Sequence, residues 1–205
     1  MAAQEASLEA AAQQVIATEH AFDAAAARDG QWTAFRAFAA ADATMFTPQP
    51  VNAQTWLSGR ADPPHSVRWQ PHELFISCDA TLAVTTGAWQ RANGNFGYFT
   101  TVWRKQADGI WKWVLDHGDE LTAARTAPEA PVVHLPDCSR SRQRMGMIVN
   151  AGTESGTYYA DDNSLWVSWW IDRDSVRRVE GRYYRGIWTR VLIKDRVMQN
   201  VVAAP

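Results

Sequence analysis

Residues 92–117 have the sequence ANGNFGYFTTVWRKQADGIWKWVLDH. The Asn-Gly and Asp-Gly pairs within it are typical of tight hairpin turns, because these residues accept the backbone conformations that such turns require. The segments that follow the two turns, 96–106 and 110–117, are rich in aromatic and β-branched side chains, which favour strands. With the alternating segment 81–92 before them, they predict three consecutive strands of an antiparallel meander.

Helices are predicted on the N-terminal side of this meander. Residues 4–28 are rich in alanine, which has the highest helix propensity, and an apolar repeat at helical spacing runs through them. Glu19 falls within that repeat. A second helix is predicted over residues 31–42 and a short one over 53–57, and a strand over 65–78 then leads into the meander.

The C-terminal part of the chain differs in composition. Residues 122–131 contain two prolines and several alanines, which is typical of a linker. Further strands are predicted beyond it, over residues 156–160, 165–171, 176–184 and 188–194. The sequence therefore predicts a first domain, a linker and a β-rich extension, over residues 1–125, 126–131 and 132–205.

Length and composition exclude several classes of protein. The 205 residues suit one domain with a small appendage. Hydrophobic residues make up 46%, enough for a packed core, and eleven tryptophans predict a thick core, a ligand pocket or both. The net charge of −2 argues against a dedicated nucleic-acid-binding protein. No apolar run has the roughly 18–20 residues that cross a membrane.

The two cysteines, Cys78 and Cys138, are too few and too far apart to form a zinc site. They form a disulfide if the protein is exported and are buried thiols if it is cytosolic. The first residues contain no signal peptide but resemble the start of a mature exported protein, so we favour the periplasm over the cytoplasm. The histidines lack metal-binding spacing and no phosphate-binding glycine motif occurs, so we expect no metal and no cofactor.

Several segments resemble a known superfamily when they are taken together. They are residues 18–22, 27–30, 41–46, 82–89, 97–105 and 108–118. Two helices, a proline-containing loop and a meander follow in the order of the nuclear transport factor 2-like superfamily, which includes ketosteroid isomerase and the SnoaL-like polyketide cyclases. The resemblance covers residues 8–122. The minimal fold of the superfamily has no counterpart of the extension.

This resemblance implies an α+β fold. N-terminal helices would pack on a strongly curved antiparallel sheet and enclose a cone-shaped apolar pocket, and the extension would add an antiparallel β-meander. The pocket would take a small apolar molecule. Homodimerisation through the open face of the sheet is common in the superfamily, so we expect a homodimer.

The enzymes of the superfamily place a carboxylate or a histidine inside the cone, where burial raises the pKa of a carboxyl toward neutrality. Asp116 and His117 lie near the end of the last strand of the meander, where SnoaL-like cyclases keep a catalytic aspartate. Adjacent strand residues point to opposite faces, so only one of the two can enter the cone. The sequence does not decide which one.

Four further residues are candidates for binding a ligand. His20 lies on the first helix, and Trp89 and Tyr98 lie on the meander. Asp42 follows the second helix, near the base region of ketosteroid isomerase, or makes a turn that ends the helix. The first helix lacks the tyrosine that ketosteroid isomerase uses as a hydrogen-bond donor, so that arrangement for steroid isomerisation is not expected.

Three hypotheses about function remain open. The first is non-catalytic binding of a small apolar molecule in the cone. The second is a cofactor-independent lyase, isomerase or cyclase with Asp116 or His117 as general acid or base. The third is a structural or interaction module whose cone is filled by side chains.

Overall fold

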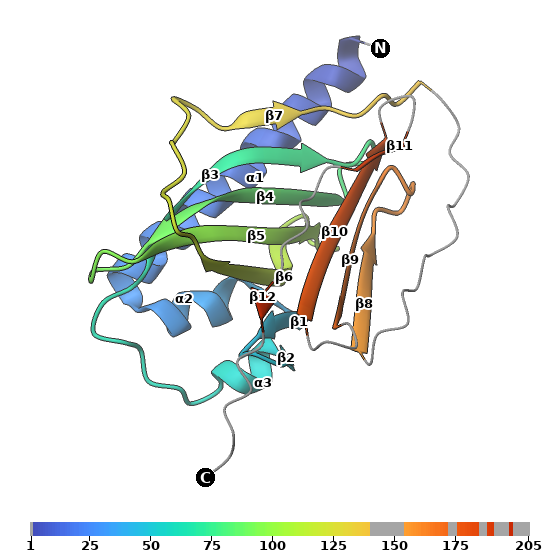
Figure 1. Cartoon of the computed structure of the whole chain (residues 1–205). Coiled ribbons are helices and arrows are strands. Elements are labelled where there is room, and N and C mark those ends of the chain that lie inside the picture. The colour runs from blue at the N-terminus through green and yellow to red at the C-terminus, as the bar shows by residue number, and fades with distance from the viewer. Residues whose placement is uncertain (1, 140–153, 172–175, 185–187, 191–196, 199–205) are drawn as a thin grey trace.

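The computed structural model describes residues 2–139, 154–171, 176–184, 188–190 and 197–198. Three helices and two sheets make up this part of the chain (Figure 1). The helices are α1 (Ala2–Asp29), α2 (Gln31–Phe38) and α3 (Ala53–Leu57). The first sheet contains β1 (Ala39–Phe46), β2 (Pro50–Asn52), β3 (Arg68–Ile76), β4 (Leu82–Gln90), β5 (Phe96–Lys105), β6 (Trp111–Glu120) and β7 (Val132–His134). The second contains β8 (Glu154–Tyr159), β9 (Leu165–Ile171), β10 (Val176–Tyr184), β11 (Trp188–Arg190) and β12 (Val197–Met198).

The long helix α1 buries one face against the first sheet. The residues on this face recur every three or four positions and are almost fully buried: Leu8, Ala12, Val15, Glu19, Phe22 and Ala26. The helix ends at Gly30, whose φ of 109° favours glycine, and a Cβ there would lie 2.3 Å from Cγ of Asp62. The Asp62 carboxylate accepts hydrogen bonds from the N–H groups of Trp32 and Thr33 and so caps the start of α2.

The predicted helices over residues 4–28 and 53–57 are confirmed, and the three meander strands lie within a few residues of their predicted bounds. The prediction of a helix over residues 31–42 is wrong for its last four residues. Ala39 already has an extended backbone, and β1 begins there. Alanine favours helix in isolation, but burial of this segment and its pairing with β2 and β6 override that preference.

The first sheet is mixed, with the strand order β2-β1-β6-β5-β4-β3-β7. The prediction of a strongly curved antiparallel sheet is therefore wrong in part. Two pairs are parallel, namely β1 with β6 and β3 with β7. The first of these pairs arises because β1 follows the helices directly and enters the sheet beside β6, the last strand of the meander. The segment Val132–His134, which the sequence assigned to the extension, adds the edge strand β7 to this sheet.

A β-bulge interrupts β6. Trp113 pairs with Trp103 of β5, and Leu115 pairs with Val102, so Val114 is an extra residue on the bulged strand. Cross-strand partners share a face of the sheet, so the simple alternation of faces along β6 is broken at this point. Trp113 and Asp116 consequently lie on the same face, although they are three residues apart.

The second sheet packs on the face of the first sheet that lies away from α1 (Figure 1). The rings of Phe46 and Trp169 are 5.2 Å apart, and the Tyr158 hydroxyl donates a hydrogen bond to Thr44 Oγ1 at 3.1 Å. The extension thus covers part of the face through which a homodimer was predicted. A dimer through that part would have to displace the extension. Of the predicted strand over 188–194, residues 191–194 lie outside the described residues.

Cys78 and Cys138 form a disulfide that joins the end of β3 to the segment after β7. The bond closes a loop of 60 residues in sequence separation, so it removes conformations from the unfolded chain. Of the two alternatives that the sequence left open for these cysteines, the structure shows the disulfide.

The disulfide leads to a stability prediction. Replacing both cysteines, Cys78→Ser with Cys138→Ser, should lower the free energy of unfolding by about 2–4 kcal/mol, because the unfolded chain regains the entropy that the cross-link removes. Urea unfolding of the oxidised wild type and the double variant measures this difference. Reduced wild type is the control and should resemble the variant. Equal denaturation midpoints for oxidised and reduced protein would contradict the prediction.

Candidate functional site

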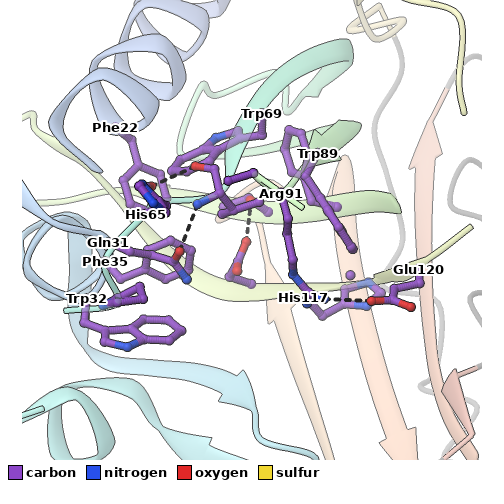
Figure 2. A pocket seen from close by; sticks show the side chains of 18 of the residues that line it. Phe22, Gln31, Trp32, Phe35, His65, Trp69, Trp89, Arg91, His117 and Glu120 are labelled. Atoms are coloured by element: carbon purple, nitrogen blue, oxygen red, sulfur yellow. Dashed lines mark hydrogen bonds and ion pairs between the residues drawn. The ribbon is translucent and has the colours of Figure 1, made fainter. Parts of the chain in front are cut away.

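A cavity of about 830 Å³ opens between the helices and the first sheet. Six aromatic side chains line it, and Figure 2 shows most of them around one space: Phe22, Trp32, Phe35, Trp69, Trp89 and Phe99. Exposed polar side chains border it, among them His65, Arg91 and Asn93. A concave surface that combines aromatic rings with a polar border is suited to a small, flat molecule with an apolar face.

Asp116 lies on the wall of this pocket that β6 forms. The hydroxyl of Thr101, on the neighbouring strand β5, donates a hydrogen bond to Asp116 Oδ1 at 2.7 Å. Burial raises the pKa of the Asp116 carboxyl to about 7, and the negative charge of Glu19 acts in the same direction, whereas Thr101 and Arg177 lower it. A carboxyl with this pKa can both accept and release a proton near neutral pH.

Glu19 lies fully buried behind the pocket wall. Trp69 Nε1 donates to its Oε1 at 2.7 Å, and Thr85 Oγ1 and Trp103 Nε1 donate to its Oε2 at 2.5 and 3.1 Å. Burial raises the pKa of the Glu19 carboxyl to about 7, although the three donors oppose the rise. The nearby charge of Asp23 adds to it. The three donors satisfy both oxygens of the buried Glu19 carboxyl, but burial outweighs them, so the neutral acid is favoured up to about pH 7.

The two carboxyls belong to one polar cluster on the helix side of the sheet. Thr85 pairs with Thr101 across β4 and β5, and Thr101 pairs with Asp116 across β5 and β6. The three residues therefore share a face, because cross-strand partners point the same way. Thr85 binds Glu19 and Thr101 binds Asp116. The cluster thus contains two carboxyls with raised pKa values, and the charge of Glu19 contributes to the rise at Asp116.

His117 borders the pocket, but its ring lies on the other side of the sheet. The ring centroid is 6.1 Å from that of Tyr98 and 6.3 Å from that of Phe46. The imidazole is buried, and burial together with the positive charge of Arg177 holds its pKa well below the usual range. It is therefore neutral at pH 7. The structure brings Asp116, and not the His117 ring, to the helix side of β6.

The structure also places the four predicted ligand-binding residues. Trp89 lines the pocket. Tyr98 points to the other face, under the guanidinium of Arg125, whose Cζ is 5.0 Å from the ring centroid. His20 is exposed on α1 outside the pocket. Asp42 is exposed and pairs with Arg104 at 2.6 Å, also outside it. The roles predicted for these residues stay predictions.

Sequence reasoning missed Glu19 and Thr101 as members of the site. A signal for Glu19 was present, because it occupies a position in the apolar repeat of the first helix, between Val15 and Phe22. A carboxyl on the buried face of a helix requires hydrogen-bond donors from whatever packs against it. No comparable signal marked Thr101, which resembles the other threonines of the meander.

In the part of the chain that the structure describes, no helix combines the length and the apolar composition needed to cross a membrane. No group of three or more histidine, cysteine, aspartate or glutamate side chains among those residues is arranged to hold a metal ion.

Comparison with known proteins gives few matches. No family model and no curated protein matches the chain. A solved structure of a ketosteroid isomerase candidate from Parabacteroides distasonis ATCC 8503 aligns with a TM-score of 0.41 and 17% identity, over 50% of this chain and 84% of that chain. An aromatic ring hydroxylase candidate from Novosphingobium aromaticivorans aligns with a TM-score of 0.39 and 12% identity, over 55% and 91%.

The raised pKa of Glu19 predicts a pH-dependent contribution to stability. Its folded-state pKa of about 7 lies above its ordinary value of 4.5, so the folded protein keeps a proton that the unfolded chain releases between these values. This contribution is fully present below pH 4.5 and is lost as the pH rises through 7. When the pH rises from 5.5 to 8, the free energy of unfolding of wild type should therefore fall on the order of 2 kcal/mol further than that of Glu19→Gln.

Urea unfolding at the two pH values measures this effect. Glu9→Gln is the matched control, because Glu9 is an exposed glutamate on the same helix. The control should keep the wild-type pH dependence. If Glu19→Gln keeps it as well, Glu19 does not hold a proton in the folded protein at the lower pH.

Proposed function

We propose that the protein binds a flat, largely apolar small molecule in the pocket and that Asp116 acts on it as a general base. The observation that carries this proposal is the carboxyl of Asp116 on an aromatic pocket wall, with a pKa of about 7. A pocket that only binds apolar molecules has no need for a desolvated carboxyl. The reaction class is proton transfer at carbon without a cofactor, as in isomerases, lyases and cyclases.

The chemistry follows from the surroundings of the carboxyl. The Asp116 carboxylate accepts a proton from a C–H group next to a carbonyl of the substrate, and the electron pair moves onto the carbonyl oxygen as an enolate. The neutral acid can then return the proton to another carbon of the same molecule. Burial favours the neutral acid, so it makes the first transfer easier than it is in water. Side chains of the pocket border with N–H groups, such as Asn93, can donate to the oxygen.

Two further proposals concern the setting of the protein. The disulfide between Cys78 and Cys138 supports an oxidising compartment such as the periplasm, because reducing compartments keep thiols free. The homodimer predicted from the sequence remains a proposal. It would have to use a surface other than the part of the sheet face that the extension covers.

The proposed function predicts a defect in proton exchange for Asp116→Asn. The probe is 2-tetralone, a flat bicyclic ketone with an acidic C–H group, and the measurement is the exchange of that hydrogen for deuterium in heavy water, followed by NMR. Wild type should catalyse the exchange, with a rate that rises through about pH 7 as Asp116 ionises. Asp116→Asn should lower the rate by about 10²–10⁴-fold, because asparagine cannot accept the proton.

The control is Asp42→Asn, which removes a carboxyl that is exposed and outside the pocket. It should exchange the probe at the wild-type rate. Quenching of tryptophan fluorescence reports binding in parallel, because Trp69 and Trp89 line the pocket. Binding without exchange by wild type would favour the non-catalytic hypothesis. Exchange that persists in Asp116→Asn would exclude Asp116 as the base.

A further inference from the structure

Arg177 of β10, in the extension, is a buried arginine that lies in the contact between the two sheets. Only 4% of its surface is exposed. Its Nη2 donates a hydrogen bond to the carbonyl oxygen of Gly118 at 3.2 Å, and its guanidinium carbon lies 4.3 Å from the ring centroid of Phe46. Both partners belong to the first sheet, because Gly118 is in β6 and Phe46 ends β1. A residue of the extension is therefore anchored on the strand that carries Asp116.

Arg177 lies behind the pocket wall. Gly118 follows Asp116 by two residues on β6, and Phe46 contacts the ring of His117, which points away from the helices. The Asp116 carboxyl points the other way, toward Thr101 and the pocket. The two charged groups thus lie on opposite sides of one strand, with protein between them. Charges separated by protein interact more strongly than charges separated by water.

We propose that Arg177 is a positioning residue for the pocket, in that its charge favours the carboxylate form of Asp116 and its hydrogen bond to Gly118 holds the strand that carries Asp116. The inference rests on the proposed role of Asp116 as a base. A base must be ionised to accept a proton, and both burial and the charge of Glu19 disfavour that form. A cation behind the wall offsets these effects without occupying space in the pocket.

The direction of the electrostatic effect agrees with this arrangement. Arg177 lowers the pKa of Asp116 and the pKa of His117, which lies on the same side of the sheet as the guanidinium. Lowering the pKa of an acid favours its anion, and lowering the pKa of a histidine favours the neutral ring. Burial is the main cause of the low pKa of His117, and the charge of Arg177 adds to it, while the same charge favours the carboxylate form of Asp116.

The other charged groups around Asp116 are placed differently. Glu19 faces it from α1 and disfavours its ionisation. Arg91, which follows the end of β4, pairs with Glu120 of β6 at 2.7 Å, and about half of each side chain is exposed. Solvent and pairing therefore weaken their effect on Asp116. The remaining titratable side chains that border the pocket, on β6 and on the loop before β3, are Asp119, His117 and His65.

The test is a titration of Asp116 in the full chain, labelled with ¹³C at the aspartate carboxyl carbons and followed by NMR. Asp116→Asn identifies the resonance. Arg177→Gln should raise the titration midpoint of Asp116 by about one pH unit, because the favourable charge is lost. Arg177→Met is a second neutral variant with the same expected shift. The pH profile of 2-tetralone exchange should move by the same amount and in the same direction.

The matched control is Arg182→Gln. Arg182 is also on β10, but it pairs with Glu180 of its own strand at 2.9 Å, so its removal should leave the Asp116 midpoint unchanged. Arg177→Lys keeps one charge and should stay within a few tenths of a pH unit of wild type. Arg177→Lys also keeps the proposal testable if the neutral variants do not fold. A rise of a full pH unit in the Asp116 midpoint of Arg177→Lys would overturn the argument from charge.

The titration needs no substrate, so the two proposals fail separately. An unchanged midpoint in Arg177→Gln or Arg177→Met overturns the role of Arg177, whatever Asp116 does in catalysis. A shifted midpoint with exchange that survives Asp116→Asn supports the electrostatic link and overturns the proposed function. A shifted midpoint in the control Arg182→Gln would overturn the specific role of Arg177, because any change in the extension would then act on the pocket.

Discussion

The hydrogen bonds to Glu19 hold the helix layer and the sheet together at the place where the pocket forms. Its carboxyl comes from α1, and its three donors come from three successive strands, with Trp69 on β3, Thr85 on β4 and Trp103 on β5. A fully buried carboxyl cannot be left without donors, so this single side chain fixes the position of α1 over all three strands. It also orients the indole of Trp69, whose ring packs edge-on against Phe22, and both of these rings line the pocket. The shape of the pocket therefore depends on a buried carboxyl that does not itself line the pocket.

The second constraint is the bulge at Val114, which decides what each face of β6 presents. Without the extra residue, Trp113 and Asp116 would lie on opposite faces, since they are three positions apart. With it, Trp113 packs under the helices, 6.1 Å from the Phe35 ring, and Asp116 still reaches the pocket. The same shift turns His117 toward Phe46 and the extension. One inserted residue thus separates two adjacent titratable side chains into two environments. One becomes a carboxyl with a pKa near neutrality and the other a neutral imidazole.

These two constraints explain how far the sequence could be interpreted. The hairpin turns and the repeat of α1 are local patterns, and they predicted the meander and the first helix correctly. The helix predicted through residue 42 failed because Ala39–Phe46 is strand only through its pairing with β2 and β6, which local propensity does not contain. The face of Asp116 was left open because a bulge has no signature in the side chains around it. The partners of Glu19 were missed because they lie 50, 66 and 84 residues away along the chain.

The extension is best understood from the face of the sheet that it covers. That face carries Phe46, Tyr98 and His117, and an uncovered sheet would expose these rings to water. Trp169 of the extension packs on Phe46, and Arg125, just before the linker, packs on Tyr98, so the chain covers this face with its own residues. The covered contact is apolar except for a few groups, and a buried guanidinium is costly there unless it has partners. Arg177 has its carbonyl partner and its aromatic partner on β1 and β6, beside the strand position of Asp116. A single strand, β6, therefore receives the pocket on one face and a cation from the extension on the other. This makes the extension part of the electrostatic environment of the pocket rather than an independent appendage.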